Sequence, residues 1–268
     1  MLNVALMTNE DFAPYCATAI ASVLRNVGKD TELSFHILTS GLSQEVKGKF
    51  YGLKAIKDCA INFVHVNKDD FKDLPLSSAN KLIPIESYYR FNLFLGFPEL
   101  DKILYLDGDM VVLGDITELF NINIDGYCLG MVKDAMINVG SIIHNVKHRL
   151  QMPPDSNYFN NGVMLINLKE CRKHGAYEKL FSWARNNKDK LVWMDQDTVN
   201  AALHDKIKEI PEKYNIQLTY RNNHVALNEV EGREVIHYAG PQKPWNTRGM
   251  FLSEHFWENY YPFMAIQN

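Results

Sequence analysis

The sequence has little of what marks several specialised classes of protein. Its 268 residues include only four cysteines, too far apart to form a metal-binding pair: Cys16, Cys59, Cys128 and Cys171. In a chain of this size such cysteines are expected to be reduced thiols rather than a disulfide framework. The net charge of −4 leaves no broad basic surface, which excludes nucleic acid as an expected partner.

Long apolar runs, repeats and low-complexity linkers are also missing. No stretch approaches the ~20 apolar residues of a membrane-spanning helix. The apolar run at 2–7 has the pattern of a first strand rather than of a signal peptide. We therefore expect a cytoplasmic protein without a transmembrane segment, and peripheral contact with the inner face of a membrane is compatible with this expectation. Because no boundary is visible, we expect the chain to fold as a single domain over 1–268.

Hydrophobic residues make up 46% of the chain and charged residues 22%, which is ordinary for a globular protein with a core. Short apolar runs alternate with segments whose apolar residues recur at helical spacing. This alternation predicts an α/β fold with a mostly parallel central sheet flanked by helices. We expect strands at 2–8, 33–38, 61–66, 103–106, 127–133, 162–168 and 235–238. We expect helices over about 14–24, 44–57, 86–95, 169–186 and 195–203, and from 253 onward.

The most informative stretch is 102–113, where an apolar strand ends in two carboxylates separated by a glycine. Side chains two residues apart at a strand end project to the same side, so Asp107 and Asp109 can converge on one point. Gly108 lets the backbone turn and leaves room for a ligand to approach. Converging carboxylates repel each other unless a cation or a proton lies between them. A hard divalent metal with phosphate oxygens is the expected occupant; the alternative is that both acids are turn residues or helix caps.

Polar clusters follow several of the other predicted strands. In open α/β sheets, ligands bind outside the carboxyl ends of the strands. Clusters with this placement are 9–11, 107–109, 160–161, 195–197 and 237–243. Their shared position favours a binding site at one edge of the sheet.

Five segments together resemble glycosyltransferase family eight, the retaining GT-A enzymes that include glycogenin and the bacterial lipopolysaccharide galactosyl- and glucosyltransferases. The segments occur in family order and span nearly the whole chain. They are SYYRF at 87–91, KILYLDGD at 102–109, YFNNGVMLINL at 158–168, DQD at 195–197 and IHYAGPQKPW at 236–245. The resemblance implies a Rossmann-like GT-A fold and a single glycosyltransferase domain.

The resemblance also implies a reaction, in which glucose or galactose passes from a UDP-sugar to an acceptor hydroxyl with retention of configuration. The implied donor is UDP-glucose or UDP-galactose, bound with Mn²⁺ or, as the alternative ion, Mg²⁺. The implied acceptor is a saccharide, a lipid-linked saccharide or a protein. Synthesis of a bacterial glycan or cell-surface saccharide is the expected context.

Carried over residue by residue, the resemblance implies Asp107, Asp109 and His237 as metal ligands. Two carboxylates and an imidazole suit Mn²⁺ better than Ca²⁺. The implied catalytic residues are Arg90, Asp195, Gln196 and Lys243. The implied nucleotide-sugar contacts are Met7, Thr8, Asn9, Phe12, Arg90, Asp107, Gly108, Asp109, Asn160, Asp195, Gln196, His237, Gly240 and Lys243.

Several of these assignments have a purely structural alternative. His237 could be a core histidine hydrogen-bonded at a strand end, and Lys243 could be a surface lysine. Arg90 could form an ion pair on a helix surface. Asp195 could be the N-cap of the helix it opens, which is compatible with a second role. Trp245 could be either a packing wedge or a sugar platform.

Two stretches qualify what the resemblance implies. In the first loop Asn9 stands where many family members have an acid, and the acids here are Glu10 and Asp11. This departure bears on the uracil and ribose contacts rather than on the fold. Residues 134–157 are the least patterned, and we expect an excursion over the sheet that acts as a lid.

The mechanism implied at Gln196 is front-face attack. Gln196 stands where the family offers a nucleophile, and an amide is a poor one. Front-face attack is therefore favoured over double displacement.

Two other functions fit part of the sequence. The segment 107–111 also resembles the DxDx[TV] motif of haloacid-dehalogenase-type phosphatases, with Asp107 as nucleophile and Asp109 as acid and base. That motif normally opens a chain, whereas here a strand-helix-strand half precedes it. The other alternative is a non-catalytic binder of nucleotide sugars.

Overall fold

The computed structural model describes residues 1–75, 84–218, 234–246 and 255–260. The chain divides into two compact units. Unit 1 comprises Met1–Val64, Leu104–Ile122 and Pro211–Asn268, and unit 2 comprises His65–Ile103 and Asn123–Ile210. The expectation of one domain over 1–268 stays a prediction, because a division by contacts does not tell whether the units fold independently.

Unit 1 is built on parallel strands in the order β3-β2-β1-β4. These strands are β1 (Leu2–Met7), β2 (Leu33–Thr39), β3 (Ala60–His65) and β4 (Lys102–Leu106), the last two crossing the unit boundary by one or two residues. β1 pairs in parallel with both β2 and β4. Continuous apolar runs such as 4–6 and 103–106 are fully buried, as expected for parallel strands covered on both faces.

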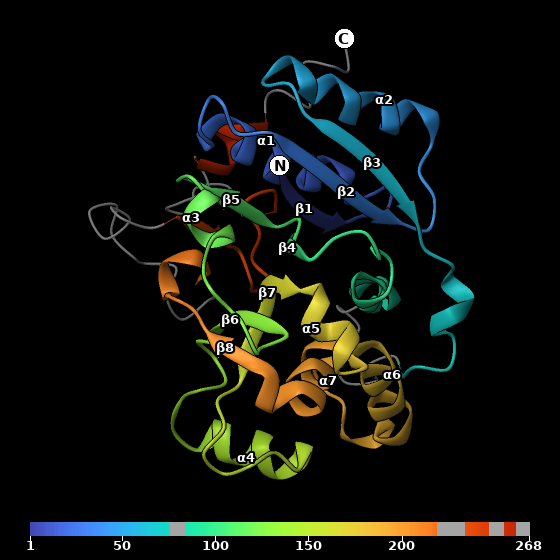
Figure 1. The fold of residues 1–268 in the computed structure, drawn as a ribbon, viewed down its shortest axis with the longest axis vertical. Coiled ribbons are helices and arrows are strands. Elements are labelled where there is room, and N and C mark those ends of the chain that lie inside the picture. Colours follow the sequence, from blue (N-terminus) through green and yellow to red (C-terminus); the bar gives the residue numbers. More distant parts are fainter. Residues whose placement is uncertain (76–83, 219–233, 247–254, 261–268) are drawn as a thin grey trace. The chain divides into compact units, whose positions relative to one another are not determined.

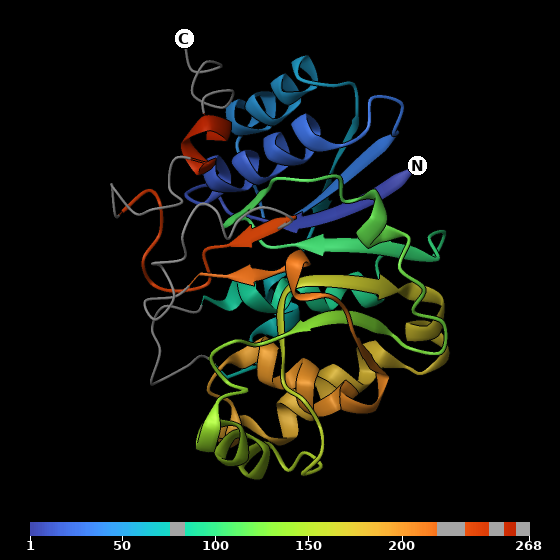
Figure 2. The same ribbon diagram turned by 90° about the vertical axis from the view of Figure 1, so that its left-hand side faces the viewer.

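Helices α1 (Ala13–Asn26) and α2 (Gln44–Gly52) lie beside strands β1 to β3 in both views (Figures 1 and 2). A proline lies in the first turn of α1, where the missing N–H is tolerated because it would have no partner within the helix. The Ser43 hydroxyl caps α2 by accepting the Val46 N–H. The helix predicted over 44–57 ends earlier, because a 3₁₀ turn, η1 (Leu53–Ala55), follows α2.

A second sheet in unit 1 has the order β5-β10-β9. Its strands are β5 (Met110–Val112), β9 (Ile216–Gln217) and β10 (Val235–His237). β10 runs antiparallel to β5 and parallel to β9. Nearby lie α3 (Thr117–Phe120) and η6 (Glu212–Tyr214). The N-cap of α3 is Ile116, and the carboxylate of the preceding Asp115 accepts the N–H groups of Thr117 and Gly28.

Unit 2 contains strands in the order β7-β6-β8. These are β6 (Leu129–Lys133), β7 (Phe159–Asn167) and β8 (Ile207–Glu209); β6 is antiparallel to β7 and parallel to β8. Its helices and 3₁₀ turns are η2 (Lys68–Phe71), η3 (Ile85–Phe94), α4 (Gly140–Leu150), α5 (Leu168–Lys173), α6 (Ala176–Asn186), η4 (Lys188–Lys190), α7 (Met194–Leu203) and η5 (His204–Lys206).

The prediction of a single long helix over 169–186 is wrong, because this stretch forms two helices, α5 and α6. Gly175 lies between α5 and α6 with φ of 60°, a left-handed conformation that glycine adopts without strain. A helix-like apolar pattern on both sides of this glycine concealed the break.

The stretch 134–157 is also more ordered than its sequence pattern indicated. It contains α4, whose Val146 and Leu150 are buried in a cluster with Tyr158. Ile142 and Ile143 pack against the same cluster, so the apolar residues recur at helical spacing among polar neighbours. The proposed lid role of this stretch stays a prediction.

The predicted fold class is confirmed, since parallel strands alternate with flanking helices. Residues 255–260 are helical, within the predicted terminal helix; the rest of that prediction lies outside the described residues. Over the part of the chain that the structure describes, no helix combines the length and apolar character needed to span a membrane.

Helix α1 holds strand β5 in place through two side chains. The Ser22 hydroxyl accepts the Val112 N–H at 2.9 Å, and Asn26 Nδ2 donates to the Val112 carbonyl at 2.9 Å. Ser22 and Val112 are fully buried, so this backbone N–H has no access to water as a substitute partner. The position of β5 therefore depends on α1.

Replacing Ser22 by alanine tests this dependence. The Ser22→Ala variant leaves the buried Val112 N–H unsatisfied, and we expect it to lower the free energy of unfolding by about 1–3 kcal/mol in urea titrations. Ser141→Ala, at an exposed position on α4, is the control and should change the free energy by no more than about 0.5 kcal/mol. Equal effects of the two substitutions would contradict the role given to Ser22.

Candidate functional site

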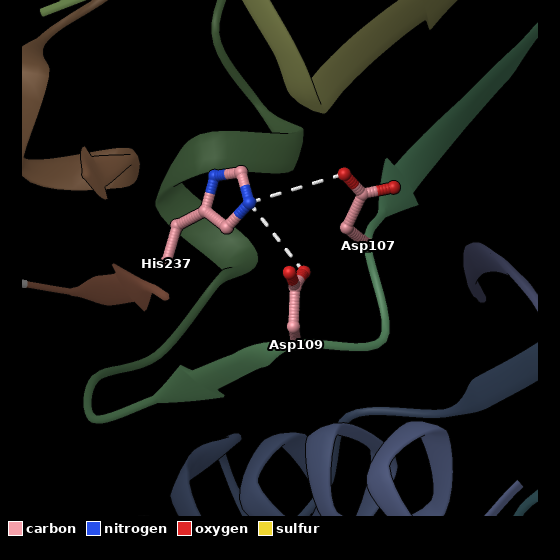
Figure 3. A group of neighbouring side chains, drawn as sticks. All are labelled: Asp107, Asp109 and His237. Carbon is pink, nitrogen blue, oxygen red and sulfur yellow. Dashed lines mark ion pairs between the residues drawn. The ribbon is translucent and has the colours of Figure 1, made fainter. Parts of the chain in front are cut away.

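Strand pairing in unit 1 brings the two predicted aspartates and His237 together. β4 ends at Leu106, Asp107 to Asp109 form the turn, and β5 begins at Met110. In the β5–β10 ladder His237 lies opposite Met110, and the Tyr238 N–H donates to the Asp109 carbonyl at 3.0 Å. Figure 3 shows the imidazole pointing toward both carboxylates. A residue far along the chain thus joins the two carboxylates through sheet register.

The distances within this group fit a shared cation. His237 Nε2 lies 3.4 Å from Asp109 Oδ1 and 3.9 Å from Asp107 Oδ2. One ligand atom of each residue lies within 4.8 Å of the others. Ligand atoms on one ion, with bonds of about 2.0–2.2 Å, lie about 3–4 Å apart. Two carboxylate oxygens and an imidazole nitrogen are a donor set for Mn²⁺ or a similar divalent ion.

Two buried neighbours orient these ligands. The Tyr105 hydroxyl donates to Asp107 Oδ1 at 2.5 Å, and Asn215 Oδ1 accepts from His237 Nδ1 at 3.0 Å. When neutral with its proton on Nδ1, the imidazole would present the lone pair of Nε2 to an ion held by the carboxylates. Sequence analysis missed both neighbours. Tyr105 could have been found, because it lies two residues before Asp107 on the same face of a strand; Asn215 carries no such signal.

Lys243 lies directly beside the aspartates. Its Nζ is 2.5 Å from Asp109 Oδ2 and donates to the Tyr238 carbonyl at 2.5 Å. Burial alone would raise the pKa of Asp109, but the charges of Lys243 and His237 and their hydrogen bonds hold that pKa well below its ordinary value. Asp109 therefore stays ionised. The alternative of Lys243 as an ordinary surface lysine is wrong.

The first loop packs against this group. Asn9 Oδ1 accepts the Phe12 N–H at 2.9 Å, an arrangement typical of a helix entry. A Cβ on Gly108 would lie 2.9 Å from the Phe12 ring and 3.3 Å from the Cys16 Cα. The Phe12 ring therefore leaves no room for a Cβ at this position, which requires glycine, and the approach of a ligand to Gly108 stays a prediction.

The remaining predicted contacts of unit 1 are placed as follows. Met7 ends β1 and is half-buried, and Thr8 is buried with its hydroxyl on the Asn9 carbonyl. Gly240 is half-buried after β10. Trp245 stacks on Tyr15 with ring centroids 3.7 Å apart, so it packs as a wedge while remaining partly exposed. The nucleotide contacts themselves stay predictions.

The other predicted site residues form a buried network in unit 2. The Arg90 guanidinium lies 2.9 Å from Asp195 Oδ2, and the Asn161 amide donates to the same oxygen. Arg90 and Asp195 are each 4% exposed, so this is not a helix-surface ion pair. The N-cap of α7 is Trp193, so the alternative of Asp195 as N-cap is wrong.

Gln196 is held on both sides of its amide. Its Oε1 accepts from the Asn160 Nδ2 and from the Asn161 N–H, each at 3.3 Å. Its Nε2 donates to Asp134 Oδ2 at 3.1 Å. Asp134 was missed by the sequence analysis, although it follows β6 as Asp107 follows β4, and that position was a usable signal.

Comparisons with known proteins agree with this geometry. A family model described as Glycosyl transferase family 8 matches residues 3–249. Lipopolysaccharide 1,2-glucosyltransferase of Escherichia coli is 31% identical over 99% of this chain and 79% of its own. Lipopolysaccharide 1,3-galactosyltransferase of Salmonella typhimurium (strain LT2) is 27% identical over 95% and 76%.

A solved structure shows the same fold. The galactosyltransferase LgtC, crystallised in complex with donor and acceptor sugar analogs, superposes with a TM-score of 0.83 at 28% identity, covering 97% of this chain and 95% of that one. The match of the family model over nearly the whole chain, together with these relatives, decides the assignment. This chain belongs to glycosyl transferase family 8 and is a glycosyltransferase with a GT-A fold.

Proposed function

We propose that the protein transfers a hexose, glucose or galactose, from a UDP-sugar to an acceptor hydroxyl with retention of the anomeric configuration. The observation that carries this proposal is the convergence of Asp107, Asp109 and His237 with Lys243 beside them. Relatives named as glucosyl- and galactosyltransferases support a hexose donor. The naming of those relatives for lipopolysaccharide supports a saccharide acceptor, lipid-linked or free, ahead of a protein.

The residues of unit 1 would bind the donor diphosphate. Asp107, Asp109 and His237 would hold Mn²⁺, or Mg²⁺ in its place. Such an ion, when bound, supplies Lewis-acid stabilisation of charge on the departing diphosphate. Lys243 would leave Asp109 to contact the diphosphate and would add a positive charge there. Tyr105 and Asn215 would keep the ligand atoms oriented in the absence of donor.

The residues of unit 2 would act at the transferred sugar. Asp195, held by Arg90 and Asn161, presents a carboxylate of fixed orientation. Gln196 carries an amide with both ends engaged, and an amide is a poor nucleophile. We therefore propose front-face attack of the acceptor hydroxyl, with Gln196 and Asn160 positioning the sugar rather than forming a bond to it.

The two other functions considered from the sequence have less support. A phosphatase with Asp107 as nucleophile is not favoured by a family match that extends over residues 3–249. Release of phosphate from simple phosphomonoesters would support it. A non-catalytic binder would retain UDP-hexose without hydrolysis and without transfer to any acceptor in a broad glycan screen.

Donor turnover tests the proposal. Hydrolysis and transfer are measured with UDP-glucose, UDP-galactose and other nucleotide sugars, with and without Mn²⁺. We expect turnover of a UDP-hexose that requires the ion, and a product whose anomeric proton signal in NMR has the configuration of the donor. An inverted product, or turnover that is insensitive to chelation, would contradict the proposal.

The metal ligands are tested by Asp107→Asn and Asp109→Asn. Each removes a negatively charged ligand, and we expect the loss of Mn²⁺-dependent turnover, by about 10²-fold or more. Mn²⁺ binding, measured by calorimetry, should weaken in parallel, while unfolding stays cooperative. Asp125→Asn, at an exposed position, is the matched control. Unchanged turnover in either ligand variant would remove that residue from the metal site.

Lys243 is tested by substitution with alanine. Loss of a positive charge beside the departing diphosphate should lower kcat by about 10²-fold, with a smaller change in the midpoint of urea unfolding. Lys169→Ala, an exposed lysine of α5, controls for loss of charge. If activity and stability fall together in Lys243→Ala, the lysine is structural.

A further inference from the structure

A buried ion pair in unit 2 joins helix α4 to the start of helix α7. Arg149 Nη1 lies 2.8 Å from Asp197 Oδ2, and Arg149 Nη2 donates to Asp197 Oδ1 at 3.3 Å. Asp197 has no exposed surface, whereas the Arg149 side chain is about one quarter exposed. Ala201 of α7 packs against the cluster that contains Val146 and Leu150 of α4. The guanidinium therefore binds the carboxylate in a bidentate arrangement.

Asp197 also collects donors from the segment that leads into α7. Its Oδ2 accepts the N–H groups of Val192 and Trp193, each at 2.8 Å. Its Oδ1 accepts the Tyr158 hydroxyl at 2.7 Å. Such donors and a counter-charge offset the cost of burying a carboxylate. Within the described residues, Arg149 is the cation that contacts Asp197. Without Arg149, Asp197 would keep only its uncharged donors, the Tyr158 hydroxyl and the two backbone N–H groups.

These contacts surround a strained residue. Met194 has φ of 34°, a left-handed backbone conformation that residues other than glycine rarely adopt. Such strain persists only when its surroundings over-determine it. The hydrogen bonds from Val192 and Trp193 to Asp197 fix the chain on one side of Met194. On the other side, the Gln196 N–H donates to the Trp193 carbonyl at 2.8 Å.

The strained turn sets the direction of the two residues that follow it. Asp195 and Gln196 occupy the first turn of α7, directly after Met194. Tyr158 provides a second link, because its hydroxyl donates to Asp197 and accepts from Gln196 Nε2 at 3.4 Å. A change at Asp197 can thus reach Gln196 through the backbone and through Tyr158.

We propose that Arg149 is a positioning residue, which through Asp197 holds the strained turn at Met194 and so orients Asp195 and Gln196. The proposal rests on the proposed function of Asp195 and Gln196 at the sugar. On this proposal, α4 holds the start of α7 in place. Asp134 and Tyr158, which flank the segment that contains α4, also contact Gln196.

Three variants of the full-length protein test the proposal. Arg149→Met removes the charge and keeps a long apolar side chain, whereas Arg149→Lys keeps the charge but cannot bond both carboxylate oxygens in the same plane. Lys147→Met is the control on the same helix, where the ammonium donates to the Pro154 carbonyl at the surface. Each variant is compared with wild type for kcat and KM of donor turnover, Mn²⁺ affinity and cooperative unfolding.

We expect Arg149→Met to lower kcat by at least tenfold while Mn²⁺ affinity and donor KM change less than threefold. Arg149→Lys should lie between it and wild type, and Lys147→Met should match wild type. A kcat in Arg149→Met that equals that of Lys147→Met would overturn the proposal. So would equal losses of kcat and Mn²⁺ affinity, which indicate general damage. If Arg149→Met does not unfold cooperatively, the same criteria apply to Arg149→Lys with a threefold loss of kcat.

Two spectroscopic measurements keep this test separate from that of the proposed function. Amide hydrogen exchange at Val192 and Trp193 should be at least tenfold faster in Arg149→Met than in wild type, and the side-chain amide resonance of Gln196 should shift. Neither depends on turnover. If wild type turns over no nucleotide sugar, the proposed function fails. Unchanged exchange and an unshifted Gln196 resonance would overturn the positioning role, whatever the activity.

Discussion

The antiparallel pairing of β5 with β10 is the constraint on which the candidate metal site depends. It sets His237 opposite Met110, next to the turn that carries Asp107 and Asp109. Because strand side chains alternate between faces, a slip of one residue would turn the imidazole away from both carboxylates. Helix α1 secures the same strand from its other side through Ser22 and Asn26. The geometry of the site is thus a consequence of sheet register.

Buried and half-buried carboxylates lie against cations in both units. Asp109 lies against Lys243 in unit 1, and in unit 2 Asp195 lies against Arg90 and Asp197 against Arg149. A buried ion pair adds little to stability after desolvation, but loss of one partner leaves an expensive charge behind. Such pairs therefore specify the positions of side chains more than they stabilise the fold.

The failures of the sequence predictions have local physical causes. One long helix was expected where Gly175 interrupts two, because the apolar periodicity is similar on both sides of the glycine. In the stretch 134–157, basic and polar residues obscure the apolar spacing of α4, so the sequence pattern does not indicate this helix. Propensity is local, and these outcomes depend on neighbours far along the chain.

The sequence by itself determined the α/β class, the strand ending in Asp107 and Asp109, and the family, because short-range apolar patterns and ordered motifs carry that information. Only the tertiary structure decided that Asn215 orients His237, that Lys243 lies on Asp109, and that Arg149 reaches Asp197. Those contacts join residues from separate elements, and their side-chain directions follow from packing and register. No local pattern in the chain encodes them.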